Sequence, residues 1–327
     1  MPNYTFRTYA ANSREYYTYG ETGSGAPPLT KKDLPFSVGL MRMLYLDMHP
    51  FLGMPAKFDH AWRNLIHTRE EQYSDEMRGY LDELAQAHFF FEVTRLEWYD
   101  RLRRAAEIGY ADKNGIDILD LLPRKRVTHI PSEIFELQRR GLALIEAVMD
   151  IDRKDESFQK RLVDYYPRNA KEDLSIFTFR PCPVSYELID GKEFAEVLYP
   201  KTVYDLIDYY LRQCVQRELR ARECKHCGHW FMITTRSTAE YCNVTLDERG
   251  HTCKERGAIK KWTERKSKDD VFKEYRREYK RRFSWIRAGR ISEAWFYNWS
   301  AEARKQKAKC DSGKISFEEF KEWLGRP

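Results

Sequence analysis

The chain has 327 residues, of which 42% are hydrophobic, 14% aromatic and 33% charged, and its formal net charge is +6. This length suits one large domain or two to three ordinary ones, with enough apolar residues to build a buried core. No apolar run approaches the roughly 20 residues of a membrane-spanning helix, and the N-terminus lacks the apolar segment of a secretory signal. The sequence therefore predicts a cytoplasmic protein with no membrane partner, in a compartment where disulfides are rare.

The first two thirds of the chain predict a helical domain. Residues 1–35 are polar and rich in tyrosine, and we expect an irregular lead-in. Residues 36–200 are expected to form an α-rich N-terminal domain, because apolar residues recur at helical spacing along much of this segment. The domain should end in a small β-hairpin, since Asp190-Gly191 separates two strand-like runs and is typical of a tight hairpin turn.

The last third predicts two further parts. Residues 201–257 should form a connecting helix, capped by Thr202, and a four-cysteine zinc-knuckle module. Residues 258–327 should form a basic, aromatic helical bundle, so that the fold class is mainly α. Within the bundle, GRISEAWFYNW from Gly289 and GKISFEEFKEW from Gly313 repeat Ile, Ser, Phe and Trp in register. Duplication and a shared preference for the same helix-start residues explain this repeat about equally well.

Four of the seven cysteines are crowded into one short segment, with the spacing C-x2-C-x14-C-x10-C. Such pairs are typical of a structural zinc site, because Zn²⁺ takes four tetrahedral ligands and a two-residue spacer lets one turn present two thiolates. Gly228 stands where such a turn needs a left-handed residue. The predicted ligands of a structural Zn²⁺ are Cys224, Cys227, Cys242 and Cys253.

Other interpretations of this segment remain open. His226, His229 or His251 can replace a cysteine, and His251 in place of Cys253 is the leading substitution. A redox role for the first cysteine pair lacks the expected βαβ context. Catalytic zinc is disfavoured, because four thiolates leave no position for water.

The sequence also shows no glycine-rich phosphate loop or nucleophile elbow, so no catalytic residue is predicted and we do not expect an enzyme.

The segments CKHCGHWF, EYC and TCKERGA, followed by YKRRFSWIRAGRISEAWFYNW and GKISFEEFKEWL, resemble an uncharacterised bacterial family of unknown function. The resemblance runs from about Pro183 to Leu324. More distantly, C-x2-C-x3-F followed by an aromatic-Cys pair resembles the CGNR-type zinc fingers of bacterial transcription regulators. That resemblance implies that the four cysteines hold zinc and that the finger binds DNA. Lys254-Glu255-Arg256 stands where those fingers have Gly-Asn-Arg, so the zinc part of the resemblance is the closer one.

A concentration of basic residues follows the cysteines. From His251 to Arg290 there are 15 Lys or Arg against 6 Asp or Glu, a local charge of +9, which leaves −3 for the rest. Such a segment favours an anionic partner. An expected helix over residues 269–286 has an apolar stripe, flanked by Arg282, and its other basic residues lie off the stripe. The predicted nucleic-acid-binding residues are Lys254, Arg256, Lys260, Lys261, Arg276, Arg277, Lys280 and Arg281.

The sequence thus supports two functional hypotheses. The leading one is a zinc-stabilised nucleic-acid-binding protein, with a bacterial regulator as its particular form. The alternative is a non-enzymatic protein-interaction module whose zinc is purely structural and whose basic helix face is simply solvated, with Glu274 and Glu278 pairing with neighbouring cations.

Overall fold

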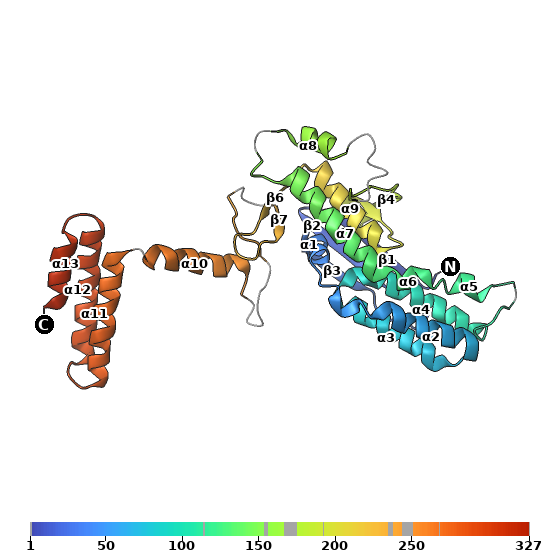
Figure 1. Cartoon of the computed structure of the whole chain (residues 1–327), viewed down its shortest axis with the longest axis horizontal. Coiled ribbons are helices and arrows are strands. Elements are labelled where there is room, and N and C mark those ends of the chain that lie inside the picture. Colours follow the sequence, from blue (N-terminus) through green and yellow to red (C-terminus); the bar gives the residue numbers. More distant parts are fainter. Residues whose placement is uncertain are drawn as a thin grey trace. The chain divides into compact units, whose positions relative to one another are not determined.

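The computed structural model describes residues 2–113, 115–153, 156–166, 175–191, 193–234, 238–243, 251–267 and 269–326, without the side chains of residues 260–262 and 264–267. The chain forms two compact units, residues 1–224 with 228–240, and residues 225–227 with 241–327. It is mainly helical and contains a small antiparallel sheet (Figure 1). In the part that the structure describes, no helix has the length and apolar character needed to cross a membrane.

The first unit is built on a five-stranded antiparallel sheet with the order β3-β2-β1-β5-β4. Its strands are β1 (Tyr4–Ala11), β2 (Arg14–Glu21), β3 (Thr30–Pro35), β4 (Val184–Ile189) and β5 (Glu193–Leu198). The expectation of an irregular lead-in over residues 1–35 was therefore wrong. Tyrosine and threonine favour strands, and Asn12 and Ser13, at φ 49° and 60°, turn β1 back onto β2.

The predicted hairpin is present as β4 and β5, and Asp190 and Gly191 both have positive φ, at 49° and 69°. The register pairs Ile189 with Glu193, so three residues, not two, separate the paired ends. The hairpin is also not a free-standing appendage. Strand β5 pairs with β1, with Leu198 opposite Thr8, and this pairing extends the N-terminal meander into the five-stranded sheet.

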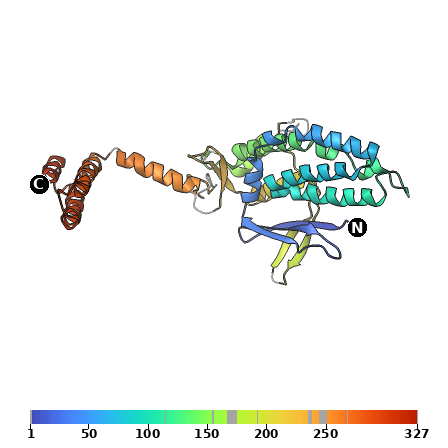
Figure 2. The same cartoon turned by 90° about the horizontal axis from the view of Figure 1, so that it is seen from below.

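Helices cover one face of this sheet (Figure 2). They are α1 (Val38–Leu44), α2 (Met54–Thr68), α3 (Glu71–Ala87), α4 (Glu92–Glu107), α5 (Ile118–Leu121), α6 (Lys125–Thr128), α7 (Ile130–Leu144), α8 (Phe158–Tyr165) and α9 (Val203–Gln216). The core between sheet and helices is rich in aromatic residues, and Phe58, Trp98 and Tyr210 are each 0% exposed. The predicted cap of α9 is confirmed, because Thr202 forms a capping box with Asp205. Tyr210 of α9 shares a hydrogen bond of 2.5 Å with Thr8 of β1, so this helix packs within the core of the first unit.

The second unit contains four helices in its described part: α10 (Cys253–Ser267), α11 (Asp270–Arg287), α12 (Glu293–Asp311) and α13 (Phe317–Gly325). Helices α11, α12 and α13 share a small aromatic core centred on Phe296, Trp299, Phe320 and Leu324. This core is separate from that of the first unit. The predicted helical bundle is therefore present, and it consists of these three helices.

The sequence repeat corresponds to a repeated helix start. Ser292 Oγ accepts a hydrogen bond from the Trp295 amide, and Ser316 Oγ accepts one from the Glu319 amide, both at 3.2 Å. Seven residues after the glycine that opens each copy, Phe296 and Phe320 are both 0% exposed. The two copies thus place equivalent caps and equivalent core residues at the start of α12 and of α13.

Candidate metal centre

A short antiparallel hairpin, β6 (Arg220–Glu223) with β7 (Trp230–Ile233), carries the first two cysteines in its turn. The Gly228 amide donates to the Cys224 carbonyl, and the Cys224 amide donates to the His229 carbonyl, both at 2.9 Å. Gly228 has a φ of 73°, so the turn ends in the left-handed conformation that the sequence predicted. The turn therefore presents Cys224 and Cys227 side by side.

The sulfur atoms of Cys224, Cys227, Cys242 and Cys253 all lie within 4.8 Å of one another. The shortest separation given between them joins Cys227 Sγ to Cys242 Sγ, at 3.8 Å. Four Zn–S bonds of about 2.3 Å in a tetrahedron place neighbouring sulfurs about 3.8 Å apart. None of the four cysteines forms a disulfide in the described structure; three are buried and Cys227 is half-buried. Their spacing and donor chemistry fit a metal ion, and four thiolates would leave no coordination position for water or substrate.

None of the nearby histidines belongs to this group, which is the one cluster of candidate metal-ligating side chains in the described residues. His226 is exposed. The ring of His229 stacks on Tyr45 with centroids 3.9 Å apart and planes 5° from parallel. Tyr45 Oη also accepts a hydrogen bond of 2.7 Å from the Trp230 amide, so His229 has a packing role. The group contains Cys253, and His251 is not a member.

Helix α10 begins at Cys253 because of a capping box that was not among the predicted features. Thr252 Oγ1 accepts from the Glu255 amide at 3.3 Å, and Glu255 Oε2 accepts from the Thr252 amide at 2.8 Å. Cys253 consequently lies in the first turn of the helix, where the positive end of the helix dipole favours a negatively charged thiolate. The pattern Thr252-x-x-Glu255 was the sequence signal for this arrangement.

Tyr241 connects the third cysteine to the same helix. Its ring lies against the backbone of Gly257, one turn after Cys253, so closely that a Cβ on this glycine would come 2.3 Å from Cδ1 and Cε1. Tyr241 directly precedes Cys242, and the contact therefore ties the Cys242 segment to α10. This packing explains a glycine inside a helix, where it otherwise costs about 1 kcal/mol relative to alanine.

The predicted nucleic-acid-binding residues fall into three groups. Arg276 and Lys280 are exposed on α11, and no ion pair of theirs is found in the described structure. Arg277 and Arg281 form ion pairs with Glu274 and Glu278, at 2.7 and 2.6 Å. Lys254 and Arg256 are exposed in the first turn of α10, whereas the side chains of Lys260 and Lys261 lie outside the description. The four α11 residues share one side of the helix, because 276 and 280, like 277 and 281, are four residues apart.

Arg282, which was expected to flank the apolar stripe of α11, is buried and 1% exposed. Its Nη2 donates to the carbonyls of Leu324 and Arg326, at 2.8 and 2.5 Å, and its guanidinium lies 4.8 Å from the ring centroid of Trp299. Burial lowers the pKa of this guanidinium. Arg282 therefore fastens the end of α13 to α11, and it is not a surface cation.

The fold and the cysteine group define a mainly helical protein with a candidate metal centre of four thiols. Residues 185–324 match a family of unknown function, DUF6076, and this segment includes the β4–β5 hairpin, the cysteines and the bundle. No curated protein and no solved structure matches the chain.

Proposed function

We propose that the protein is a zinc-stabilised nucleic-acid-binding protein whose C-terminal helices bind the phosphate backbone and stack against bases. The observation that carries the proposal is that cations and accessible aromatic rings lie next to one another on α11. A hollow of about 190 Å³ is lined by Tyr279, Lys280, Phe283 and Arg287. Phe283 is 41% exposed, although it lies on the apolar stripe of the helix. Exposed rings beside unpaired cations are the usual means of holding single strands without sequence preference.

Zinc is the proposed ion because the donor set consists of four thiols. Thiolates select soft or borderline ions, and a closed tetrahedron of four cysteines is the usual structural zinc site. The distant resemblance to CGNR-type zinc fingers points to the same ion. The small α10 module has little apolar core, so the metal would contribute much of its folding free energy, on the order of 10 kcal/mol.

The charge distribution supports an anionic partner. Residues 251–290 carry a local charge of +9, whereas the other residues of the chain together carry −3. On α11, two of the four predicted cations are paired with glutamates, and Arg276 and Lys280 carry the charge that is free to meet phosphate.

The test is binding of the zinc-loaded full chain to fluorescently labelled oligonucleotides, single-stranded and duplex, over a range of salt concentrations. We expect the logarithm of the association constant to fall linearly with the logarithm of the salt concentration. Single strands should bind at least as tightly as duplex. Absence of binding at low ionic strength would remove nucleic acid as the partner.

A protein-interaction module is the second candidate, and exposed aromatic residues on α12 favour it. Trp295 and Tyr297 are 37% and 59% exposed, beside a helix on which Arg277 and Arg281 are neutralised by glutamates. Aromatic residues of this kind are enriched at protein interfaces. Salt-insensitive self-association or capture of a protein partner, together with no oligonucleotide binding, would select this candidate.

A further inference from the structure

A second candidate site lies in the first unit and involves none of the cysteines. A pocket of about 320 Å³ opens between α4, the turn from α6 to α7, the segment before β4, and the N-terminus of α9. Its volume is at the lower end of the range for small-molecule sites. Part of its wall is apolar, formed by Ile130, Ile134 and Leu137, and six of the other lining residues are charged.

The charged part of the lining is mostly basic. Four cationic residues, Lys125, Arg126, Arg180 and Lys201, face two carboxylates, Glu97 and Glu133, so the lining carries a formal charge of +2.

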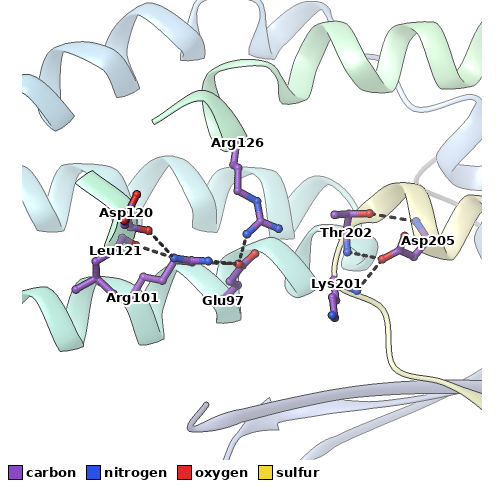
Figure 3. A network of polar contacts seen from close by, with 8 residues as sticks. All are labelled: Glu97, Arg101, Asp120, Leu121, Arg126, Lys201, Thr202 and Asp205. Carbon is purple, nitrogen blue, oxygen red and sulfur yellow. Dashed lines mark hydrogen bonds and ion pairs between the residues drawn. The ribbon is translucent and has the colours of Figure 1, made fainter. Parts of the chain in front are cut away.

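The carboxylate of Glu97 is already engaged. Its Oε1 accepts from Arg126 Nη1 at 2.5 Å and from Arg101 Nη2 at 2.8 Å (Figure 3). Lys125, Arg180 and Lys201 form no ion pair in the described residues. The pocket therefore holds uncompensated positive charge beside an apolar wall.

The N-terminus of α9 adds backbone donors to the same pocket. Asp205 Oδ2 accepts from the amides of Lys201 and Thr202, at 2.8 and 3.0 Å, as Figure 3 shows. This capping box leaves the next two amides of the first turn, those of Val203 and Tyr204, without an acceptor in the described structure, and both residues line the pocket. Such first-turn amides bind anions, together with the positive end of the helix dipole.

Two further residues show that the pocket is organised. The guanidinium of Arg180 lies 3.7 Å from the ring centroid of Tyr204, which holds this cation at the helix end. Trp98, another lining residue, is 0% exposed, and its indole N–H has no acceptor in the described structure. A buried donor without a partner is unfavourable. The N–H itself has almost no accessible surface, so it is not counted among the donors that the pocket offers.

We propose that this pocket binds a small organic dianion, a phosphomonoester or a dicarboxylate, whose apolar body lies against Ile130, Ile134 and Leu137. The +2 charge of the lining matches a dianion, and the guanidinium of Arg180 with the α9 amides offers the donors that phosphate and carboxylate oxygens accept from. The pocket is too small for a folded partner. The ligand is therefore a metabolite-sized molecule, and this site is independent of the proposed nucleic-acid surface.

The test is isothermal titration calorimetry of the full zinc-loaded chain with four probes: phenyl phosphate, phthalate, inorganic phosphate and phenol. We expect at least one of the two aromatic dianions to bind more tightly than inorganic phosphate, and phenol not to bind. Whichever aromatic dianion is preferred distinguishes a phosphomonoester from a dicarboxylate. Failure of both aromatic dianions to bind, or equal binding of inorganic phosphate, overturns the proposal.

Variants locate the binding. Lys201→Glu should weaken the preferred dianion about tenfold or more, because it replaces an attractive charge by a repulsive one. The matched control is Lys57→Glu on α2, an exposed lysine outside the pocket, which should leave the affinity unchanged. If Lys201→Glu does not fold, the affinity of Arg180→Gln for the same dianion is measured in its place. Equal losses in the pocket and control variants would overturn the assignment to this pocket.

Discussion

The ring of Tyr241 lies so close to Gly257 that a Cβ at position 257 would come 2.3 Å from two of its ring carbons. This contact joins the segment of Cys242 to the helix that begins at Cys253. A Gly257→Ala change must therefore displace the ring or the helix. We expect a loss of about 1–3 kcal/mol in the free energy of unfolding of this module, typical of overpacking, together with weaker metal retention.

Gly79 offers the control for this change. It also lies inside a helix, α3, but nothing stands within 4 Å of an added Cβ. Gly79→Ala should therefore stabilise the protein by about 0.5–1 kcal/mol, as expected for an exposed helix interior. Thermal unfolding and zinc content of the two variants measure the difference. Two variants of equal stability would show that the Tyr241 contact is not tight.

Metal content tests the cysteine group directly. We expect about one equivalent of zinc per chain by elemental analysis, and loss of that zinc in Cys224→Ser or Cys253→Ser. Cys182→Ser is the control, because Cys182 is a half-buried free thiol outside the group. Removal of the metal by a chelator should lower the unfolding temperature, since metal binding contributes folding free energy. A metal-free protein with an unchanged transition would contradict a structural role.

Features encoded by neighbouring residues could be predicted from the sequence. The starts of α12 and α13 follow from Ser292 and Ser316, and the turn of the first cysteine pair follows from Gly228, because each depends on contacts a few residues apart. The gathering of the four cysteines was predictable for a chemical reason, since their spacing suits one ion.

Features that depend on distant segments could not be predicted. Strand β1 gains its neighbour β5 through Thr8 and Leu198, nearly two hundred positions apart, and without that partner the tyrosine-rich start resembles a loop. Arg282 was expected only to flank the apolar stripe, because its own helix gives no sign of Trp299 and the α13 carbonyl that enclose it. The dianion pocket likewise draws its charges from separate elements between Glu97 and Lys201.

Two unpaired cations on α11 give the sharpest test of the nucleic-acid hypothesis. The double change Arg276→Ala with Lys280→Ala should reduce the magnitude of the log–log salt slope by about 1.4 on single strands, since each phosphate contact contributes about 0.7. Affinity should fall alike for all sequences, because phosphate contacts carry no base information.

The comparison is the double change Arg277→Ala with Arg281→Ala on the same helix. These cations are partly neutralised by Glu274 and Glu278, so we expect a smaller loss of affinity. The Arg276→Ala and Lys280→Ala variant should keep its stability within about 0.5 kcal/mol, because both side chains are exposed and form no ion pair in the described structure. The Arg277→Ala and Arg281→Ala variant should be less stable, because Glu278 is buried and loses a cation that compensates its charge. The same loss in both variants would show that the existing ion pairs do not decide which cations meet phosphate.

The last prediction concerns the pH dependence of stability and rests on Glu15 in β2. Its carboxylate accepts from the amides of Gly39 and Ser37, at 2.5 and 3.2 Å, and the residue is 0% exposed. Burial raises the pKa of Glu15 to about 7, although both amides act in the opposite direction. The folded state therefore holds this proton more tightly than the unfolded chain does. The resulting stability is fully present below pH 4.5 and is lost as the pH rises to about 7, by roughly 3 kcal/mol.

His88 titrates with the opposite sign in the same core. Burial lowers its pKa to about 3, so its contribution is present above pH 6.5 and is lost as the pH falls toward 3. Between pH 4.5 and 6.5 the two groups change the free energy of unfolding in opposite directions. The pH dependence of wild-type stability alone would therefore hide both contributions. Glu15→Gln removes only the first group. We therefore expect the stability of this variant relative to wild type, from urea unfolding, to rise between pH 4.5 and 7 and then stay constant. Parallel curves for the two proteins would show that Glu15 titrates normally in the fold.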